Sequence, residues 1–103
     1  MGFPKKGTPM DVKQAFGSAL KLTRKAKGLT QEDFSQISSR TYISTLERGL
    51  YVPTIDKVDT IAKFMGVHPV TLFALSYLSK ANSTDQTVLL DQVKEELEEL
   101  LKN

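Results

Sequence analysis

Residues 29–49, which read LTQEDFSQISSRTYISTLERG, constrain the fold more than any other part of the chain. They hold two short amphipathic helix patterns that are separated by a Ser-rich turn. Thr30 is suited to cap the first pattern, because its hydroxyl can accept a hydrogen bond from a backbone N–H of the first turn. Ser38 and Ser39 can provide a cap for the second, and Gly49 is typical of a helix C-cap in the left-handed conformation. The segment therefore predicts a helix, a tight turn and a second helix over residues 40–48.

Caps, prolines and glycines elsewhere predict four further helices and no convincing strand. These helices are expected to begin at Pro9 after an N-cap at Thr8, at Pro53-Thr54, at His68-Pro69 and within Ser83-Thr84-Asp85-Gln86. The first would run to Lys27, where Gly28 stops it, and Gly66 would stop the helix that begins near Pro53. Apolar residues at helical spacing are expected to line the inner faces: Val12, Phe16, Ala19, Leu20 and Ala26; Phe34 and Ile37; Ile55, Val58, Ile61, Ala62, Phe64 and Met65; Val70, Leu72, Phe73, Leu75 and Leu78.

Length and composition limit the class of protein. The chain has 103 residues, of which 40% are hydrophobic and 25% charged, and this favours one small all-α domain with an appendage. It has no cysteine, hence no disulfide framework and no thiolate site, as in proteins of a reducing cytoplasm. Residues 1–10 lack the apolar core of a signal peptide, and no apolar run approaches membrane-spanning length. We expect a soluble cytoplasmic protein with no membrane partner.

Residues that could carry catalysis are sparse. His68 is the one histidine and precedes Pro69, which favours a capping or surface role. Asp56 and Asp59 share the solvated face of a helix, and the sequence holds no metal-ligand cluster, phosphate-binding Gly loop or catalytic triad pattern. We expect a protein that is not an enzyme, with no catalytic residues, no metal and no cofactor.

The net charge of +2 hides an uneven distribution. Residues 1–50 carry nine lysines or arginines against four acids, a net charge of +5. Residues 51–103 carry five lysines against eight acids, a net charge of −3. A basic half suits a polyanion, and an acidic half rich in leucine suits contact with protein.

The helix over residues 40–48 has two distinct faces when its side chains are placed at 100° intervals. One side would pack inward through Tyr42, Ile43 and Leu46. The opposite side carries small or flexible polar residues: Arg40, Thr41, Ser44, Thr45 and Arg48. Such side chains can reach base edges or phosphates in a DNA major groove, although the face would also suit an ordinary solvated helix.

Other short motifs extend the pattern over about residues 12–75. They are Leu20 with Arg24, Gly28-Leu29-Thr30-Gln31-Glu32, Ile43-Ser44, Leu46-Glu47-Arg48-Gly49, Pro53, Ile61-Ala62, Met65-Gly66-Val67 and Leu72-Phe73. In this order they resemble the Cro/CI-type helix-turn-helix regulators, also called the XRE or lambda-repressor-like family. The resemblance implies a five-helix DNA-binding domain, plus a C-terminal amphipathic helix in this chain. It also implies that the third helix reads DNA as a dimer, usually to control transcription.

The resemblance also implies roles for single residues. Bases would be read by Arg40, Thr41, Ser44 and Thr45. The resemblance implies phosphate contacts for Gln31 and Arg48. Apart from the resemblance, we expect Lys5 and Lys6 of the basic arm, Ser39 and Tyr42 to hold phosphates as well. Arg24 and Glu47 match a pair that forms a buried structural ion pair in several relatives. The chain departs from the family at Ile37-Ser38-Ser39, where the turn is about two residues shorter, and this leaves the exact base contacts open.

The last segment has the pattern of a strongly amphipathic acidic helix. Apolar residues recur at spacings of three and four, and we expect them to form a dimerisation element: Leu90, Val93, Leu97, Leu100 and Leu101. Folding back on the chain's own domain is the alternative, because fewer than three heptads make a poor isolated coiled coil. The expected organisation is a flexible basic arm at 1–8, a DNA-binding domain at 9–80 and the amphipathic helix at 83–103.

These observations favour a regulator of transcription, most simply a repressor, that binds double-stranded DNA at a pseudo-palindromic operator as a homodimer. Two alternatives stay open. The chain could be an antitoxin or a restriction-modification controller, with a protein partner on its C-terminal helix. It could also be a protein-interaction module that keeps the fold without DNA binding.

Overall fold

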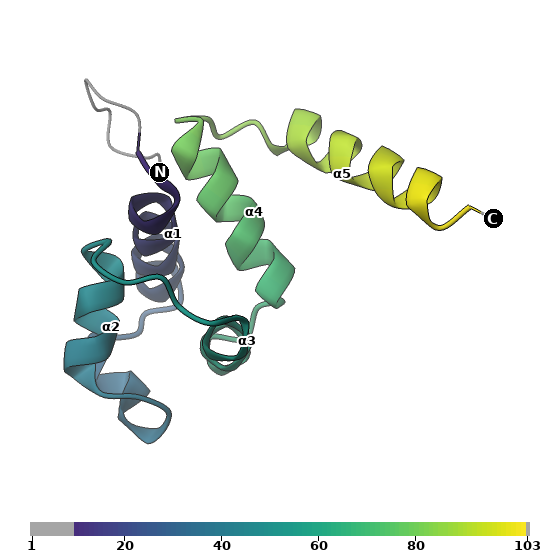
Figure 1. Ribbon diagram of the computed structural model, residues 1–103. Helices are drawn as coiled ribbons and strands as arrows, with labels where there is room; N and C mark the ends of the chain where they lie inside the picture. The colour runs from purple at the N-terminus through teal and green to yellow at the C-terminus, as the bar shows by residue number, and fades with distance from the viewer. Residues whose placement is uncertain (1–9, 103) are drawn as a thin grey trace.

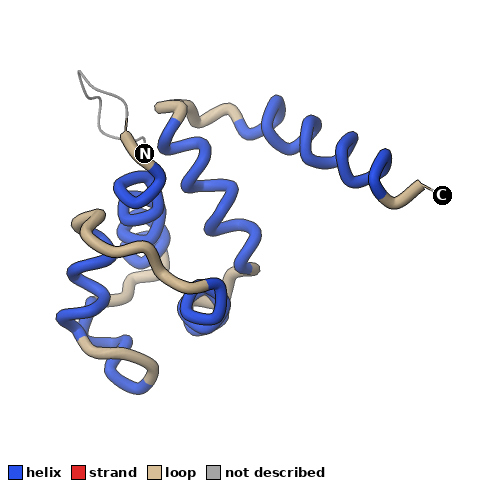
Figure 2. Tube along the Cα trace, in the orientation of Figure 1, coloured by secondary structure: helices blue, strands red, loops and turns tan. Residues whose placement is uncertain are grey.

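A computed structural model describes residues 10–102, and over this range the protein is entirely helical (Figure 1, Figure 2). The elements in order are α1 (Val12–Ala26), the 3₁₀ helix η1 (Gln31–Gln36), α2 (Arg40–Glu47), α3 (Ile55–Phe64), α4 (Pro69–Lys80) and α5 (Gln86–Leu100). Five helices form the body and α5 extends from it, which confirms the expected five-helix domain with an additional C-terminal helix.

The core forms where α1 and α4 pack side by side and the other short helices close around them. Its fully buried side chains include Leu20 of α1, Phe34 of η1, Ile43 and Leu46 of α2, and Leu72 of α4. The rings of Phe34 and Phe64 lie 4.8 Å apart, so that η1 contacts the end of α3. These contacts hold α2 against the body through its inner face alone.

The first helix begins later than the sequence predicted. Its N-cap is Asp11, whose carboxylate accepts a hydrogen bond from the backbone N–H of Gln14 at 2.8 Å. The Gln14 side chain accepts in return from the backbone N–H of Asp11 at 3.2 Å. The predicted cap, Thr8, lies outside the described residues. A reciprocal capping box satisfies two end groups at once, which explains why the helix starts at Val12.

Some residues near the ends of the predicted inward faces are exposed, so their assignment to the core was wrong. Val12 is 51% exposed and Ile55 is 79% exposed, because each opens its helix at the rim of the core. Ala26 is exposed in the last turn of α1. On α4, Val70 and Phe73 also keep much of their surface exposed, so that this helix has an apolar outer stripe as well as a buried one.

Gly17 allows α1 and α2 to approach closely. A Cβ atom at this position would lie 2.5 Å from the carbonyl oxygen of Leu46 and 2.7 Å from that of Glu47. Neither oxygen belongs to a flexible side chain, so a larger residue would have to push the two helices apart. Gly17 thus sets the distance at which the C-terminal end of α2 rests on α1.

A well-defined connection joins α4 to α5. Asn82 follows the end of α4 in the left-handed conformation, with φ of 52°, and the N–H of Ser83 donates to the carbonyl of Leu78 at 2.9 Å. This is the hydrogen-bond pattern that terminates a helix at a left-handed residue. Asp85 then caps α5 by accepting from the N–H of Thr87. The predicted start within 83–86 is therefore refined to an N-cap at Asp85.

Helix α5 extends away from the body, and only its first turn rests on α4 (Figure 1). None of its residues is buried, and its apolar stripe remains uncovered. Within this chain, α5 does not fold back on its own domain. Over residues 10–102 no single helix has both the length and the apolarity to cross a membrane, and α3 and α4, which together would pass by length and composition, are bent by 103°.

Replacing Gly17 with alanine tests the close approach of α1 and α2. Helix propensity alone would make Gly17→Ala stabilising by about 1 kcal/mol. We expect the opposite, a loss of about 1 to 3 kcal/mol in the free energy of unfolding, because the added methyl group overpacks against backbone. Urea unfolding followed by circular dichroism measures it. Lys21→Ala on the exposed side of α1 is the control, and unchanged or increased stability of Gly17→Ala would contradict the close approach.

Candidate nucleic-acid interface

Helix α2 lies at the edge of the body with one side free (Figure 1). Of the two serines predicted to provide its N-cap, Ser39 is the cap, and its hydroxyl accepts from the N–H of Tyr42 at 3.0 Å. Ile43 and Leu46 are completely buried, and Tyr42 packs against the same core. The opposite side of α2 therefore faces away from the protein.

Four of the predicted DNA-contacting residues lie together on this free side. Arg40 and Thr41 are exposed, Ser44 is half-buried, and all three border a shallow polar hollow together with Gln31 of η1. Thr45, also half-buried, donates its hydroxyl to the carbonyl of Thr41 at 2.5 Å. The face thus presents one cation and several short polar groups, with no large apolar side chain to obstruct contact with a groove.

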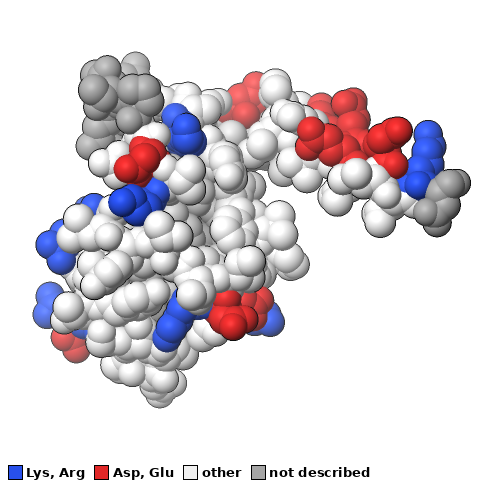
Figure 3. Space-filling view, viewed as in Figure 1, with Lys and Arg blue, Asp and Glu red and all other residues white. Residues whose placement is uncertain are grey.

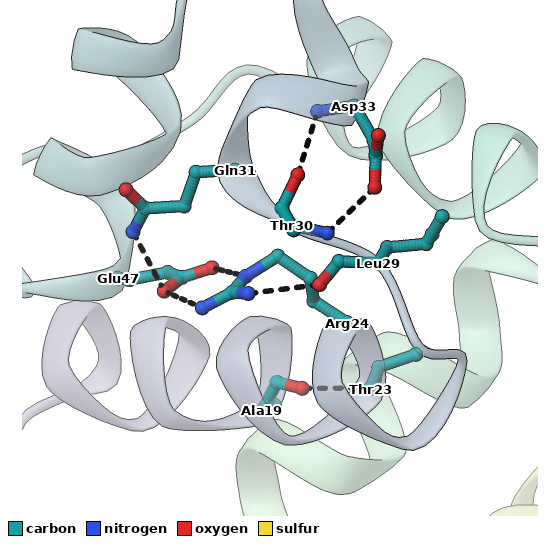
Figure 4. Close-up of polar contacts among 8 residues, drawn as sticks. All are labelled: Ala19, Thr23, Arg24, Leu29, Thr30, Gln31, Asp33 and Glu47. Atoms are coloured by element: carbon teal, nitrogen blue, oxygen red, sulfur yellow. Dashed lines mark hydrogen bonds and ion pairs between the residues drawn. The ribbon is translucent and has the colours of Figure 1, made fainter.

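A buried ion pair supports α2 from behind (Figure 4). Arg24 donates from Nε and Nη2 to the two carboxylate oxygens of Glu47, at 2.6 and 2.9 Å. Its Nη1 donates to the carbonyl of Leu29 at 2.9 Å. The two side chains are only 10% and 4% exposed. The geometry is bidentate, which fixes orientation as well as charge, and it joins α1, the loop before η1 and the end of α2.

The pair with Glu47 also keeps Arg24 charged. The hydrogen bond to Glu47 raises the pKa of Arg24, and the neighbouring carboxylate charge adds to this, although burial acts in the opposite direction. A raised pKa on a cation stabilises the fold at every pH below the unfolded value, and this contribution is lost only as pH rises through the folded pKa. The guanidinium is already a strong base before this increase, so the contribution of Arg24 is constant at ordinary pH.

Gln31 connects this ion pair to the exposed face. Its Nε2 donates to Oε1 of Glu47 at 3.1 Å, as Figure 4 shows. A carboxylate is only an acceptor, so the amide nitrogen must face Glu47, and its second N–H remains free. Gln31 is half-buried at the rim of the polar hollow. It can therefore brace α2 and still offer a donor outward.

The short turn is explained by the kind of helix that precedes it. Residues Gln31–Gln36 form a 3₁₀ helix, which Thr30 caps by accepting from the N–H of Asp33 at 3.2 Å. Six residues at about 2.0 Å per residue advance as far as eight at about 1.5 Å in an α-helix. A segment about two residues shorter therefore covers the same distance. Ile43 and Leu46 consequently keep their places in the core.

Sequence reasoning missed a cluster beside α2. The ring of Tyr42 stacks on that of Tyr51 with centroids 6.4 Å apart, and Nζ of Lys57 lies 5.6 Å above the Tyr42 ring. Burial raises the pKa of Tyr42, so its hydroxyl stays protonated and able to donate. Tyr51 and Lys57 are exposed next to the predicted contact residue Tyr42. In the sequence, the spacing between the aromatic residue Tyr51 and the basic residue Lys57 was the signal that could have indicated this cluster.

The other predicted contact residues differ in position. Arg48 is exposed directly after α2, and the hydroxyl of Ser39 retains its own proton to donate, because as a cap it only accepts. Lys5 and Lys6 lie outside the described residues. In Figure 3 basic side chains are spread over the body with some acidic ones among them, and further acidic side chains gather along α5. The uneven charge of the sequence is thus separated in space.

This arrangement defines a helix-turn-helix protein, and comparisons agree. A family model described as Helix-turn-helix matches residues 20–72. HTH-type transcriptional regulator y4dJ of Sinorhizobium fredii, itself uncharacterised, is 40% identical over 65 residues, which cover 61% of this chain and 84% of that protein. The chain belongs to the Cro/CI-type (XRE) helix-turn-helix family of DNA-binding transcriptional regulators.

Solved structures share the fold. A crystal structure of the clp gene regulator ClgR from Corynebacterium glutamicum matches with a TM-score of 0.68 at 23% identity, covering 91% of this chain and 94% of that one. A hypothetical transcription factor, NHTF from Neisseria, matches with a TM-score of 0.58 at 25% identity, covering 68% and 84%. The ClgR match leaves out fewer than a tenth of the residues, so it must include part of α5.

Removing Glu47 tests whether the ion pair holds α2. In Glu47→Ala the guanidinium of Arg24 is left buried without its partner, and we expect a loss of about 3 kcal/mol in the free energy of unfolding. The double variant Arg24→Met/Glu47→Leu leaves no unpaired charge and should recover most of this loss.

Urea unfolding measures all three proteins. The control is Glu32→Ala, which removes an exposed carboxylate 3.6 Å from Arg40 and should change stability by no more than about 0.5 kcal/mol. A loss for Glu47→Ala as small as that of the control would contradict a supporting role for the pair.

Proposed function

We propose that this protein is a transcriptional repressor that binds a pseudo-palindromic operator as a homodimer. In this proposal, α2 of each subunit enters a major groove, with the two recognition helices about 34 Å apart on one side of the DNA. The observation that carries the proposal is the free polar face of α2, which is supported from behind by the pair of Arg24 and Glu47. Occupancy of a promoter would then exclude polymerase.

Base reading is assigned to Arg40, Thr41, Ser44 and Thr45. A guanidinium on the edge of guanine is the commonest specific contact in the major groove and contributes about 1 to 3 kcal/mol of discrimination. In the free protein Arg40 lies 3.6 Å from Glu32, and both side chains are well exposed. An exposed pair of this kind contributes about 1 kcal/mol or less. Exchanging Glu32 for a guanine edge is therefore favourable.

Phosphate contacts are assigned to the groups that surround this face. Gln31 and Ser39 have free donors at the start of η1 and α2, and Arg48 lies at the other end of α2. Tyr42 is supported by its stacking on Tyr51. Lys5 and Lys6 of the basic arm complete the proposal from the sequence alone. Such contacts fix the register of the protein on the duplex without reading sequence.

Dimerisation is assigned to the uncovered stripe of α5. An isolated 15-residue helix with no buried residue is only marginally stable in water, so α5 needs a partner surface. Leu90, Val93, Leu97, Leu100 and Leu101 supply the apolar side of that contact. Two linked recognition helices bind a two-fold site far more strongly than one, because the second contact becomes intramolecular.

Substituting Arg40 tests base reading directly. Arg40→Ala should weaken binding to the selected operator by about 1 to 3 kcal/mol and reduce discrimination against a scrambled duplex. The matched control is Arg48→Ala, which should weaken binding to both duplexes equally and lower the salt slope by about 1. Fluorescence anisotropy between about 50 and 200 mM salt measures both effects. Unchanged discrimination in Arg40→Ala would contradict its assignment.

Two substitutions on α5 test dimerisation. Leu97 and Val88 are both exposed, but Leu97 lies on the apolar stripe and Val88 on the opposite side of the helix. Leu97→Glu should reduce the mass in solution from twice 11.5 kDa to one chain and weaken operator binding at least about tenfold. Val88→Glu should leave both unchanged.

Light scattering after size exclusion measures the mass. A parent protein that is already monomeric, or that carries a second kind of chain, would contradict the homodimer. The second result would indicate a partner protein on α5 instead.

A further inference from the structure

The outer side of α4 carries an apolar surface that its own chain borders only with the start of α5 and otherwise leaves uncovered. Val70 lies three and four residues before Phe73 and Ala74, which lie four and three residues before Tyr77, and all keep part of their surface exposed. Phe73 and Tyr77 border one hollow, and Val70 and Ala74 border another. The four residues therefore form a continuous stripe between two hollows, which we call the α4 stripe.

The first hollow, of about 280 Å³, lies between α1, α3 and α4. Its exposed apolar residues include Val12 and Ile55, the two residues that the sequence had assigned to the core. Lys13 is the one charged residue among its described lining residues. The α4 stripe and this hollow form one continuous apolar surface. On an ordinary protein surface, by contrast, exposed apolar residues are scattered singly.

The same chain carries a helix that matches this surface. The stripe on α5 runs from Leu90 to Leu101 and spans about 18 Å at 1.5 Å per residue, whereas the α4 stripe from Val70 to Tyr77 spans about 12 Å, so the stripe on α5 is long enough to cover it. A two-fold dimer needs a surface that is complementary to itself, with each subunit giving and receiving the same contact. The chain carries both halves of such a contact.

Charge favours the α4 stripe of a second copy over the α5 of that copy as the surface on which α5 docks. Residues 86–100 carry five acids and one lysine, a net charge of −4. Two α5 helices side by side would bring two such acidic helices together, and like charges in contact repel. The α4 stripe instead has Lys13 in its hollow and Lys80 in the last turn of α4. Docking on α4 pairs the acidic helix with cations.

We infer that α5 of each subunit docks on the α4 stripe and adjoining hollow of a second copy of this chain. This inference rests on the proposed dimer and states which surfaces form it. Docking on its own α4 would require α5 to turn back sharply at residues 81–85. The connection there is fixed by Asn82 in the left-handed conformation and by the cap at Asp85, which direct α5 away from the body.

Engineered cysteines test the pairing, because the chain has none of its own. Leu97→Cys is made as one variant, and Val70→Cys, Phe73→Cys and Tyr77→Cys as three others. Each α4 variant is co-expressed with Leu97→Cys as separate chains and gently oxidised. At least one mixture should give about tenfold more covalent dimer than the control mixture of Leu97→Cys with Lys25→Cys, since a disulfide forms only where Cα atoms lie within about 7 Å.

Each other outcome overturns the inference. Covalent dimers from Leu97→Cys alone would show that two α5 helices pair with each other. Leu97→Cys is also combined with each α4 cysteine in a single chain, and a disulfide within that chain, with no cross-link in the mixtures, would show that α5 folds back. A dimer without any cross-link would place the interface elsewhere.

The proposed function fails separately. The uncross-linked parent protein is weighed by light scattering and titrated with a selected operator. A dimer that binds DNA but shows no cross-link between α4 and α5 would contradict only this inference. A parent protein that shows no salt-dependent DNA binding would contradict the proposed function, whatever the cross-links show.

Discussion

The ion pair between Arg24 and Glu47 is the interaction on which the geometry of α2 depends. Arg24 uses three of its donors, two toward Glu47 and one toward the carbonyl of Leu29, and Gln31 adds a third hydrogen bond to the carboxylate. Every buried polar side-chain atom of residues 10–102 has a partner. The charges are thus buried without a missing hydrogen bond, the condition under which such a pair is tolerated. The pair contributes more to the position of α2 than to the net free energy of unfolding.

Much of this arrangement follows from the sequence because it is local. Thr30, Ser39 and His68 cap their helices as predicted, since a cap needs only the residues of the next turn. The inward faces of η1 and α2 follow from helical spacing for the same reason. The family resemblance, which rests on ordered short motifs, is confirmed by the match to residues 20–72.

The remaining features depend on contacts between distant segments, which spacing alone cannot reveal. Val12 and Ile55 have the spacing of core residues, but their position at the rim is decided by how α1, α3 and α4 pack. Gly17 reads as a weak helix residue until the carbonyls of α2 are seen against it. Tyr51 joins the candidate site because the loop after α2 returns beside Tyr42. The effect of the shorter turn on the position of α2 could not be predicted, because the sequence pattern did not show that η1 is a 3₁₀ helix.

The two ends of the chain contribute different things to the proposed regulator. In the proposed regulator the basic half would carry the DNA-facing surface and the acidic α5 the contact between subunits, so that neither element would suffice alone. The most direct measurement is selection of bound fragments from a random pool of duplex DNA by the full chain. A dimeric regulator of this kind should enrich two half-sites related by two-fold symmetry, with centres about 10 base pairs apart or a multiple of this. Bound fragments without a common sequence, or with one unpaired half-site, would contradict it.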